Sequence, residues 1–208
     1  MYVPSAFAQR DPQQLYAFLE RHSFATLVSH HAGESIATHL PLLLERSAGV
    51  LGTLSGHVAR ANPQWGTAAE QPVLAIFQGP HAYISPAWYA AENVVPTWNY
   101  LAVHAYGRLR VIDDRDRLLS LVTRMVQQYE GERPTPWALD TQDEAYVSGM
   151  LQGIVGFEIE IERLEGQWKL NQHHSVERRA RVIQALRESD SPDAVQIADL
   201  MDDSLAAI

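Results

Sequence analysis

Cysteine is missing from this 208-residue sequence, and lysine is almost missing as well. Without cysteine the chain forms no disulfide, thiolate zinc site or iron–sulfur cluster, and it has no cysteine nucleophile. Lys169 is the single lysine among 16 basic residues, so the other fifteen are arginines. Either a compositional bias of the genome explains this imbalance, or position 169 requires a compact ammonium group rather than a planar guanidinium.

Basic charge and long apolar runs are also scarce. The 25 acidic residues outnumber the 16 basic ones and give a formal net charge of −9. Because DNA binding draws its strength from neutralising phosphates, a chain this acidic needs a local basic patch to bind DNA. The apolar run 40–44 is far shorter than the ~18 residues of a membrane span, and the first residues do not resemble a secretory signal. We therefore expect a cytoplasmic protein with no membrane partner.

Several common catalytic and ligand-binding motifs are absent too. The sequence contains no HExxH zinc motif, no GxSxG nucleophile elbow, no P-loop and no GxGxxG dinucleotide fingerprint. It has nine histidines, but neighbours such as His30 and His31 point to opposite faces of a strand. We expect these histidines to be exposed or hydrogen-bonded, a few of them near a ligand, and we expect no metal site.

What the sequence does contain is a series of short apolar segments at hairpin spacing. They predict strands at 24–29, 36–44, 50–56, 73–77, 82–85, 98–111 and 157–161. Gln78-Gly79-Pro80 is expected to separate the fourth strand from the fifth, and Gly107 to bend the sixth. The first three strands follow one another closely and predict an antiparallel meander. The fold class is therefore mainly β, an antiparallel barrel with peripheral helices.

Helical periodicity and capping residues predict the helices. The expected spans are 12–22, 58–65, from Asp113 or Asp114 to 129, from a Thr141 capping box to 151, 175–188, and from Pro192 onward. The character of the chain changes after Leu170, where an arginine-rich helix and an acidic tail follow. The expected division is thus a barrel domain at 1–170 and a C-terminal helical extension at 171–208.

The stretch from Leu51 to Trp65 is the most informative local segment. It is interpreted as a strand, then Gly56, then a short helix start, and such a start offers free N–H groups to an anion. Ser55, His57 and Arg60 add donors there, and an arginine can bind a terminal phosphate through two hydrogen bonds. The alternative is an ordinary helix cap beside a surface arginine.

Aromatic residues are dense at 83–89 and 95–100. So many aromatic side chains close together are typical of an interface or of a binding site for a planar ligand. The alternative is that these side chains pack in the core. Next to an anion site, an aromatic loop suits a flat phosphorylated molecule.

Three segments together carry a resemblance to a known family: Gly56-His57-Val58-Ala59-Arg60-Ala61-Asn62-Pro63-Gln64-Trp65, Val95-Pro96-Thr97-Trp98-Asn99-Tyr100 and Gly166-Gln167-Trp168-Lys169-Leu170-Asn171-Gln172. With residues 1–7 and 38–44, they resemble the PaiB-type family of FMN-binding negative transcriptional regulators. The match runs in order over roughly residues 1–188. The resemblance implies an FMN-binding split β-barrel, a homodimer that holds FMN between its subunits, and a repressor of transcription associated with proteases and sporulation.

The resemblance also implies roles for individual residues. The strand from Thr38 through His39 and Leu40 to Leu42 would lie along the flavin ring through its backbone. The phosphate would be held by Ser55, His57 and Arg60, with Asn62 nearby. Tyr83 and Ser85 would come from the other subunit, and Trp168 and Lys169 would approach the cofactor from the C-terminal segment.

Two departures from the family pattern affect groups that would touch a substrate. The family usually has a longer, lysine-containing loop where this chain has Ala90-Ala91-Glu92-Asn93. After Leu170 the family tends to have Ser-Gln-Asn and a basic residue, where this chain has Asn171-Gln172-His173-His174. Two alternatives to a regulator therefore stay open. One is a flavin-dependent oxidoreductase acting on a small molecule, related to pyridoxamine-phosphate oxidases. The other is a repressor that binds DNA directly. The second fits poorly, because the cluster Arg178, Arg179, Arg181 and Arg187 is diluted by glutamates and is expected to form a solvated helix face.

Overall fold

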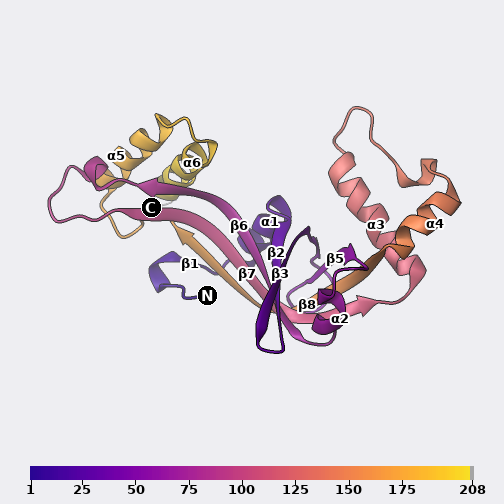
Figure 1. The fold of residues 1–208 in the computed structure, drawn as a ribbon. Helices are drawn as coiled ribbons and strands as arrows, with labels where there is room; N and C mark the ends of the chain where they lie inside the picture. The colour runs from indigo at the N-terminus through magenta and orange to yellow at the C-terminus, as the bar shows by residue number, and fades with distance from the viewer. Residues whose placement is uncertain (207–208) are drawn as a thin grey trace. The chain divides into compact units, whose positions relative to one another are not determined.

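The computed structural model describes residues 1–206 and has a mainly antiparallel β architecture (Figure 1). The strands are β1 (Ala8–Gln9), β2 (Phe24–His31), β3 (Glu34–Pro41), β4 (Leu43–Glu45), β5 (Thr53–Ala59), β6 (Pro72–Ile84), β7 (Thr97–Ile112) and β8 (Ile154–Lys169). The α-helices are α1 (Pro12–Arg21), α2 (Gln64–Ala68), α3 (Arg115–Glu130), α4 (Glu144–Gln152), α5 (Val176–Arg187) and α6 (Pro192–Ala206). Three short 3₁₀ helices are η1 (Ser5–Phe7), η2 (Pro86–Tyr89) and η3 (Leu139–Thr141).

The strands form one hydrogen-bonded sheet in the order β3-β2-β6-β7-β8-β5-β4, with β1 added on β8. β2 and β3 form a hairpin in which Thr26 pairs with His39, and β4 and β5 form a second one in which Leu43 pairs with Ser55. The expected mainly antiparallel fold is confirmed, but the meander is not. The predicted strand 36–44 is divided between two hairpins, because β3 ends at Pro41 and β4 begins at Leu43.

The residues cluster into two compact units. Unit 1 contains Met1–Phe18, Gln78–His104 and the chain from Glu165 onward. Unit 2 contains Leu19–Phe77 and Ala105–Leu164. Whether residues 1–170 fold apart from the rest stays a prediction. No helix within residues 1–206 is both long and apolar enough to cross a membrane.

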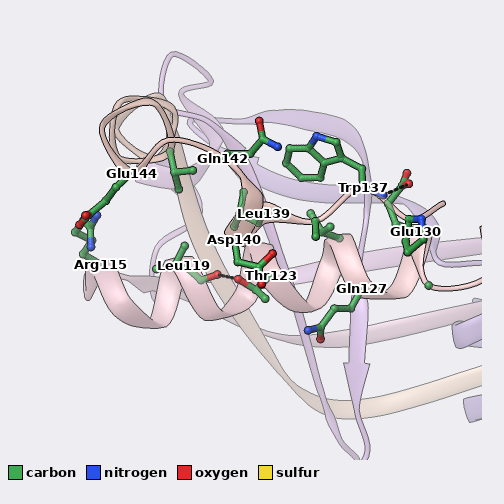
Figure 2. A pocket seen from close by; sticks show the side chains of 15 residues that line it. Arg115, Leu119, Thr123, Gln127, Glu130, Trp137, Leu139, Asp140, Gln142 and Glu144 are labelled. Atoms are coloured by element: carbon green, nitrogen blue, oxygen red, sulfur yellow. Dashed lines mark hydrogen bonds between the residues drawn. The ribbon is translucent and has the colours of Figure 1, made fainter.

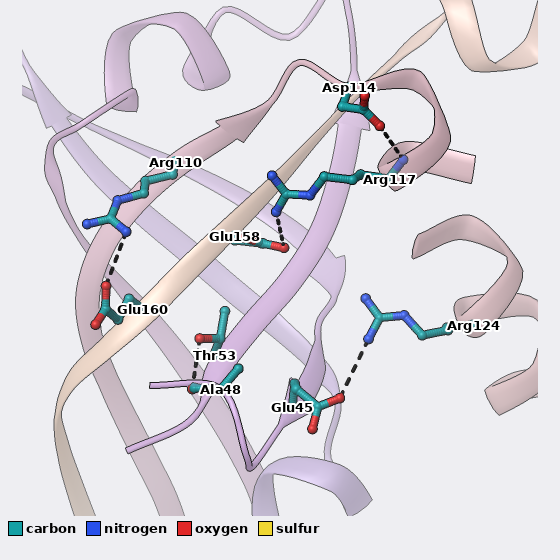
Figure 3. A network of polar contacts seen from close by, with 9 residues as sticks. All are labelled: Glu45, Ala48, Thr53, Arg110, Asp114, Arg117, Arg124, Glu158 and Glu160. Carbon is teal, nitrogen blue, oxygen red and sulfur yellow. Dashed lines mark hydrogen bonds and ion pairs between the residues drawn. The ribbon is translucent and has the colours of Figure 1, made fainter. Parts of the chain in front are cut away.

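Strand β8 shows how the sequence pattern builds unit 2. Phe157, Ile159 and Ile161 are buried, and the acidic residues between them face outward. Glu158 pairs with Arg117 at 2.9 Å and Glu160 with Arg110 at 3.3 Å (Figure 3). The alternation of apolar and acidic residues at 157–161 therefore predicted a half-exposed strand correctly. It underestimated the length of that strand, which runs from Ile154 to Lys169.

Helix α3 contributes to an apolar cluster of unit 2. The cluster is made by Ile112, Leu118, Leu121, Met125 and Leu151. The first turn of α3 is capped as predicted, since the Asp114 carboxylate accepts a hydrogen bond from the Arg117 backbone N–H at 2.8 Å. Helix α4 is capped by Asp143 rather than by the predicted Thr141. The Thr141 hydroxyl instead donates to the backbone oxygen of Ala138 within η3.

In unit 1, helices α5 and α6 pack against each other through small and branched apolar residues (Figure 1). The buried residues are Val182, Ile183, Leu186, Ala194, Ile197, Ala198 and Met201. The arginines of α5 form the predicted solvated face only in part, since Arg181 and Arg187 are exposed and Arg179 is not. Arg179 is buried and donates to the backbone oxygen of Met201, and Arg181 donates to that of Tyr89. Arg187 pairs with Asp202 at 2.7 Å and with Asp199 at 3.3 Å.

Two local predictions about strand ends are wrong. Gln78-Gly79-Pro80 does not end β6, which continues to Ile84, although the alternation of burial changes phase at Gln78-Gly79. The predicted helix 58–65 is also absent as such, because β5 extends to Ala59 and only the five residues of α2 are helical. Gly56 lies within β5, where an added Cβ would meet Leu42 Cδ2 at 2.8 Å. This glycine allows a close approach of chain segments and does not start a helix.

Candidate functional site

Ser55 and His57 form a polar pair on one face of β5 in unit 2. They are two residues apart on a strand, so their side chains point the same way. The Ser55 hydroxyl oxygen and His57 Nδ1 are both buried, and neither has a hydrogen-bond partner within residues 1–206. Burial lowers the pKa of His57, which favours the neutral imidazole. Buried polar atoms are nearly always paired in folded proteins, so these two point to a missing polar partner.

The turn after β5 is tied to strand β3. The Asn62 side chain donates to the Thr38 hydroxyl at 2.9 Å, and its own oxygen accepts from the Gln64 backbone N–H at 2.9 Å. Thr38 and Asn62, which the family resemblance assigns to the flavin ring and the phosphate, are thus neighbours in the structure. This contact joins two segments that are 24 residues apart in the chain.

The other two residues assigned to β3 serve the sheet with their side chains. His39 Nδ1 lies 3.0 Å from the Thr26 hydroxyl directly across the hairpin, and Leu40 is buried in the core. β3 stands at one end of the strand order, so one row of its backbone groups has no neighbouring strand in the described sheet. Backbone groups on this edge of β3 are therefore available to a ligand, and the His39 side chain is exposed as well.

Arg60 is exposed and held by backbone carbonyls. Its Nε donates to Gln152 O at 2.7 Å and its Nη2 to Ile154 O at 2.8 Å. Trp65 adds a hydrogen bond from its indole to the Arg60 backbone oxygen at 3.0 Å. No hydrogen bond in the described part of the chain joins Arg60 to Ser55 or His57. Two of the five guanidinium donors have protein partners, which leaves three for another acceptor.

The site residues of unit 1 lie on β6, β7 and β8. Tyr83 and Trp98 are 47% and 52% exposed, and their rings meet edge to face with centroids 5.8 Å apart. The Ser85 hydroxyl accepts from the Ala87 backbone N–H at 3.3 Å and caps η2, which is a structural role. Large exposed aromatic rings on adjacent strands are typical of a contact surface.

The ends of β7 and β8 bring Lys169 to Thr97. The Lys169 ammonium donates to the Thr97 hydroxyl at 2.5 Å, and burial lowers the pKa of this lysine. Trp168, the residue before it, packs on Phe18 with ring centroids 5.0 Å apart. The single lysine of the chain is thus placed beside one of the resemblance segments, 95–100.

Two buried amides were not among the expected site residues. The Gln64 side chain donates to Leu27 O, the Ser29 hydroxyl and Ile36 O at 3.0–3.2 Å. Asn171 has a left-handed backbone, with φ +60°, and donates to the Tyr89 hydroxyl at 3.1 Å. Both lie inside the resemblance segments, but only tertiary contacts distinguish a buried amide from an exposed one. Their position in those segments was the one available signal.

Two histidines stack beside Asn171 in unit 1. The rings of His173 and His174 are 4.1 Å apart, and Tyr89 lies 4.8 Å from His174. Burial lowers the pKa of both, and the Lys169 charge lowers that of His173 further. Within the described residues, no group of three histidine, aspartate or glutamate side chains is arranged to hold a metal ion.

Comparison with known proteins identifies the family. Residues 1–163 match a family model described as "Putative FMN-binding domain". The chain is also 40% identical over 206 residues to "Protease synthase and sporulation protein PAI 2" of Bacillus subtilis strain 168. That match covers 99% of this chain and 98% of the relative. The chain belongs to the PaiB-type family of FMN-binding-domain proteins. The cofactor of this family is FMN.

Further relatives of the PaiB-type chain extend the comparison. An uncharacterized Aspergillus fumigatus protein is 33% identical over 184 residues, which cover 71% of this chain and 70% of the relative. The flavocytochrome Anf3 of Azotobacter vinelandii has a similar fold, with a TM-score of 0.57 at 15% identity over 78% of this chain and 69% of that chain. The FAD and heme binding protein of Mycobacterium smegmatis also has a similar fold, with a TM-score of 0.57 at 15% identity. That match covers 83% of this chain and 78% of the other chain. These structures confirm the split-barrel fold.

Proposed function

We propose that this protein is a homodimeric FMN-binding regulator that lowers transcription, in processes of the protease and sporulation type. The observation that carries the proposal is the similarity to the Bacillus subtilis relative, which extends over nearly the full length of both chains. The name of that relative connects it to protease synthesis and sporulation, and the matched domain is described as FMN-binding.

The polar pair on β5, Ser55 and His57, is the proposed binding site of the FMN phosphate. A phosphate offers acceptor oxygens and negative charge, and Ser55 and His57 are buried groups that lack partners. A hydroxyl and an imidazole N–H both donate to such oxygens. The Asn62 amide and the three remaining donors of Arg60 are the other groups we assign to this phosphate. The residues present therefore fit FMN.

The flavin ring is proposed to lie along the backbone of β3 from Thr38 to Leu42. Tyr83 and Ser85 of a second copy, and Trp168 and Lys169, complete the site. Tyr83 is half exposed beside Trp98, so this aromatic surface is available to a second subunit or to a flat ring. When bound, FMN supplies a ring system that accepts and releases electrons.

Regulation is proposed to act through a protein partner or a metabolite rather than through direct DNA contact. Three of the four clustered arginines on α5 are used within the chain, as Arg179, Arg181 and Arg187 donate to backbone or carboxylate oxygens. The net charge of −9 opposes nonspecific attraction to DNA.

A titration of the purified chain with FMN, followed by visible absorbance, tests the cofactor assignment. Arg60→Ala is expected to weaken FMN binding by about 1.5–3 kcal/mol, or roughly 10- to 150-fold in Kd, because a charge-assisted pair with the phosphate is lost. Ser55→Ala is expected to weaken it less. Arg124→Ala is the matched control, since this exposed arginine on α3 pairs with Glu45 at 3.8 Å. Equal affinities of all four proteins would refute the phosphate site.

Two further measurements separate the proposed regulator from its alternatives. Turnover of NADH or NADPH by the FMN-loaded protein would identify an oxidoreductase. A DNA affinity that falls steeply with salt concentration would identify a direct repressor. A yellow protein with neither activity is the expected result.

A further inference from the structure

A cavity of about 570 Å³ lies in unit 2, between α3, the segment 131–142 that follows it, and the start of α4 (Figure 2). This volume lies within the range of about 300–1,000 Å³ that is typical of small-molecule sites. None of the residues assigned above to FMN lines it. The cavity is therefore a second candidate site, independent of the proposed function.

The wall on the α3 side is an apolar stripe that borders the core cluster. Leu118, Leu121 and Met125 of α3 face the apolar cluster of unit 2 and are buried. Leu119 and Val126, with Thr123 between them, line the cavity, and Leu119 also packs against that cluster. Helix α3 thus presents apolar side chains to the cavity as well as to the core.

The opposite wall comes from the segment 131–142, which is anchored to α3. Glu130 at the end of α3 accepts a hydrogen bond from the Trp137 backbone N–H at 3.1 Å, and its other oxygen pairs with Arg133 at 3.1 Å. Figure 2 shows the Trp137 indole and Leu139 on this segment above the helix. The indole is 44% exposed although it borders an apolar space. This anchoring preforms the wall, so a ligand would not have to order it.

The rim of the cavity is acidic. Asp140, Glu144 and Glu130 line it against a single basic residue, Arg115. Arg115 is already placed 3.6 Å from Asp116, and Glu130 is occupied by Arg133. The Asp140 side chain makes no hydrogen bond or ion pair within residues 1–206. A free carboxylate and an indole that line the same cavity are two groups that attract an organic cation.

We propose that this cavity binds a small amphipathic organic cation. Its hydrocarbon or single-ring body lies against Trp137, Leu119 and Val126, and its protonated amine faces Asp140. The apolar walls supply the hydrophobic contact, and the acidic rim selects for positive charge. An anionic molecule with the same body is repelled by the same rim.

Three probes with one body and different end groups test the proposal: phenylbutylamine, phenylbutanol and phenylbutyrate. Binding to the full chain is measured by ligand-observed NMR, with and without saturating FMN. The amine is expected to bind roughly tenfold more tightly than the carboxylate, a difference of about 1.4 kcal/mol. The alcohol is expected to lie between them. Equal binding of all three, or no binding of the amine, would overturn the proposal.

Two variants with the same change in charge locate the amine. Asp140→Asn is expected to lower the affinity of the amine several-fold and to leave the alcohol unchanged. Glu132→Gln, on the same segment but outside the cavity lining, is expected to bind all three probes like the wild type. If both variants behave alike, the preference for the amine is a general effect of net charge and the site is wrong.

Two further variants test the cavity itself. Val126→Trp is expected to fill it and to abolish binding of every probe. Trp137→Ala keeps the helix unchanged and is expected to weaken the amine through loss of the aromatic wall. FMN absorbance of each variant shows whether it remains folded. Probe binding that persists in both folded variants would place the ligand elsewhere.

Discussion

A single buried side chain, Gln64, holds α2 against the β2–β3 hairpin in unit 2. Its amide donates to two carbonyls and a hydroxyl of that hairpin. Gln64→Leu keeps the volume and leaves these acceptors unpaired, so it is expected to lower the free energy of unfolding by about 1–3 kcal/mol. Thermal unfolding measures the change. Gln128→Leu on the exposed side of α3 is the control, and an equal loss of stability in both would contradict the role of Gln64.

The ionisation of His57 predicts a pH dependence of stability. Burial lowers the pKa of this histidine in the folded state, while the unfolded chain keeps the ordinary value of about 6.5. Below that value the unfolded state binds more protons, so stability is lost as the pH falls. Urea unfolding between pH 7 and pH 5, without added FMN, is expected to show this loss. His57→Gln is expected to reduce it.

The control for this measurement is His31→Gln, on the exposed β2–β3 hairpin. It is expected to lose stability with falling pH as steeply as the wild type. His173 and His174 have pKa values lowered in the same direction, so His57→Gln makes the dependence shallower without removing it. An unchanged slope in His57→Gln would show that this imidazole titrates as freely in the fold as in the unfolded chain.

Between elements, the contact of β7 with β8 depends on Gly107. A Cβ at this position would lie 2.1 Å from the Glu160 backbone oxygen and 2.8 Å from Ile159 Cγ2. Gly107→Ala is therefore expected to push the strands apart and to destabilise the protein by about 1–3 kcal/mol or more. Gly149→Ala in α4 meets nothing within 4 Å and is expected to be neutral or stabilising by up to about 1 kcal/mol. Chemical denaturation compares the two, and equal effects would contradict this contact.

The elements that the sequence predicted well are those with a local cause. Helix α1 begins after Asp11, whose carboxylate accepts from the Gln13 backbone N–H, and the Ser175 hydroxyl caps α5 in the same way. Strand β6 was predicted as two pieces because Gly79 and Pro80 are local breaking signals. The structure has one strand of thirteen residues, in which the alternation of burial changes phase at Gln78-Gly79 and then resumes. Local chemistry predicts helix ends, and tertiary packing decides whether a strand continues.

The candidate site also has one part that the sequence predicted and one part that depends on distant contacts. The resemblance supplied Thr38 and Asn62, and the structure joins them by a hydrogen bond. It assigned Arg60 to a phosphate, yet two of the donors of that arginine are taken by backbone oxygens 92 and 94 residues away. No local sequence pattern predicts a hydrogen bond to residues so distant in the chain. The burial of Gln64 and Asn171 was missed for the same reason, since both depend on partners distant in the chain.

For the whole molecule, the decisive expectation is a dimer that completes the FMN site. One chain has a mass of 23.3 kDa, so light scattering is expected to give twice that value. Trp98→Glu puts a charge into the exposed aromatic pair with Tyr83 and is expected to shift the protein toward monomers. Because Tyr83 and Ser85 would come from the second copy, FMN affinity is expected to fall with the dimer, by roughly tenfold or more. Tyr146→Glu, an exposed aromatic residue on α4, is the control and should change neither property. A monomeric Trp98→Glu protein that binds FMN as tightly as the wild type would mean that one chain holds the cofactor alone.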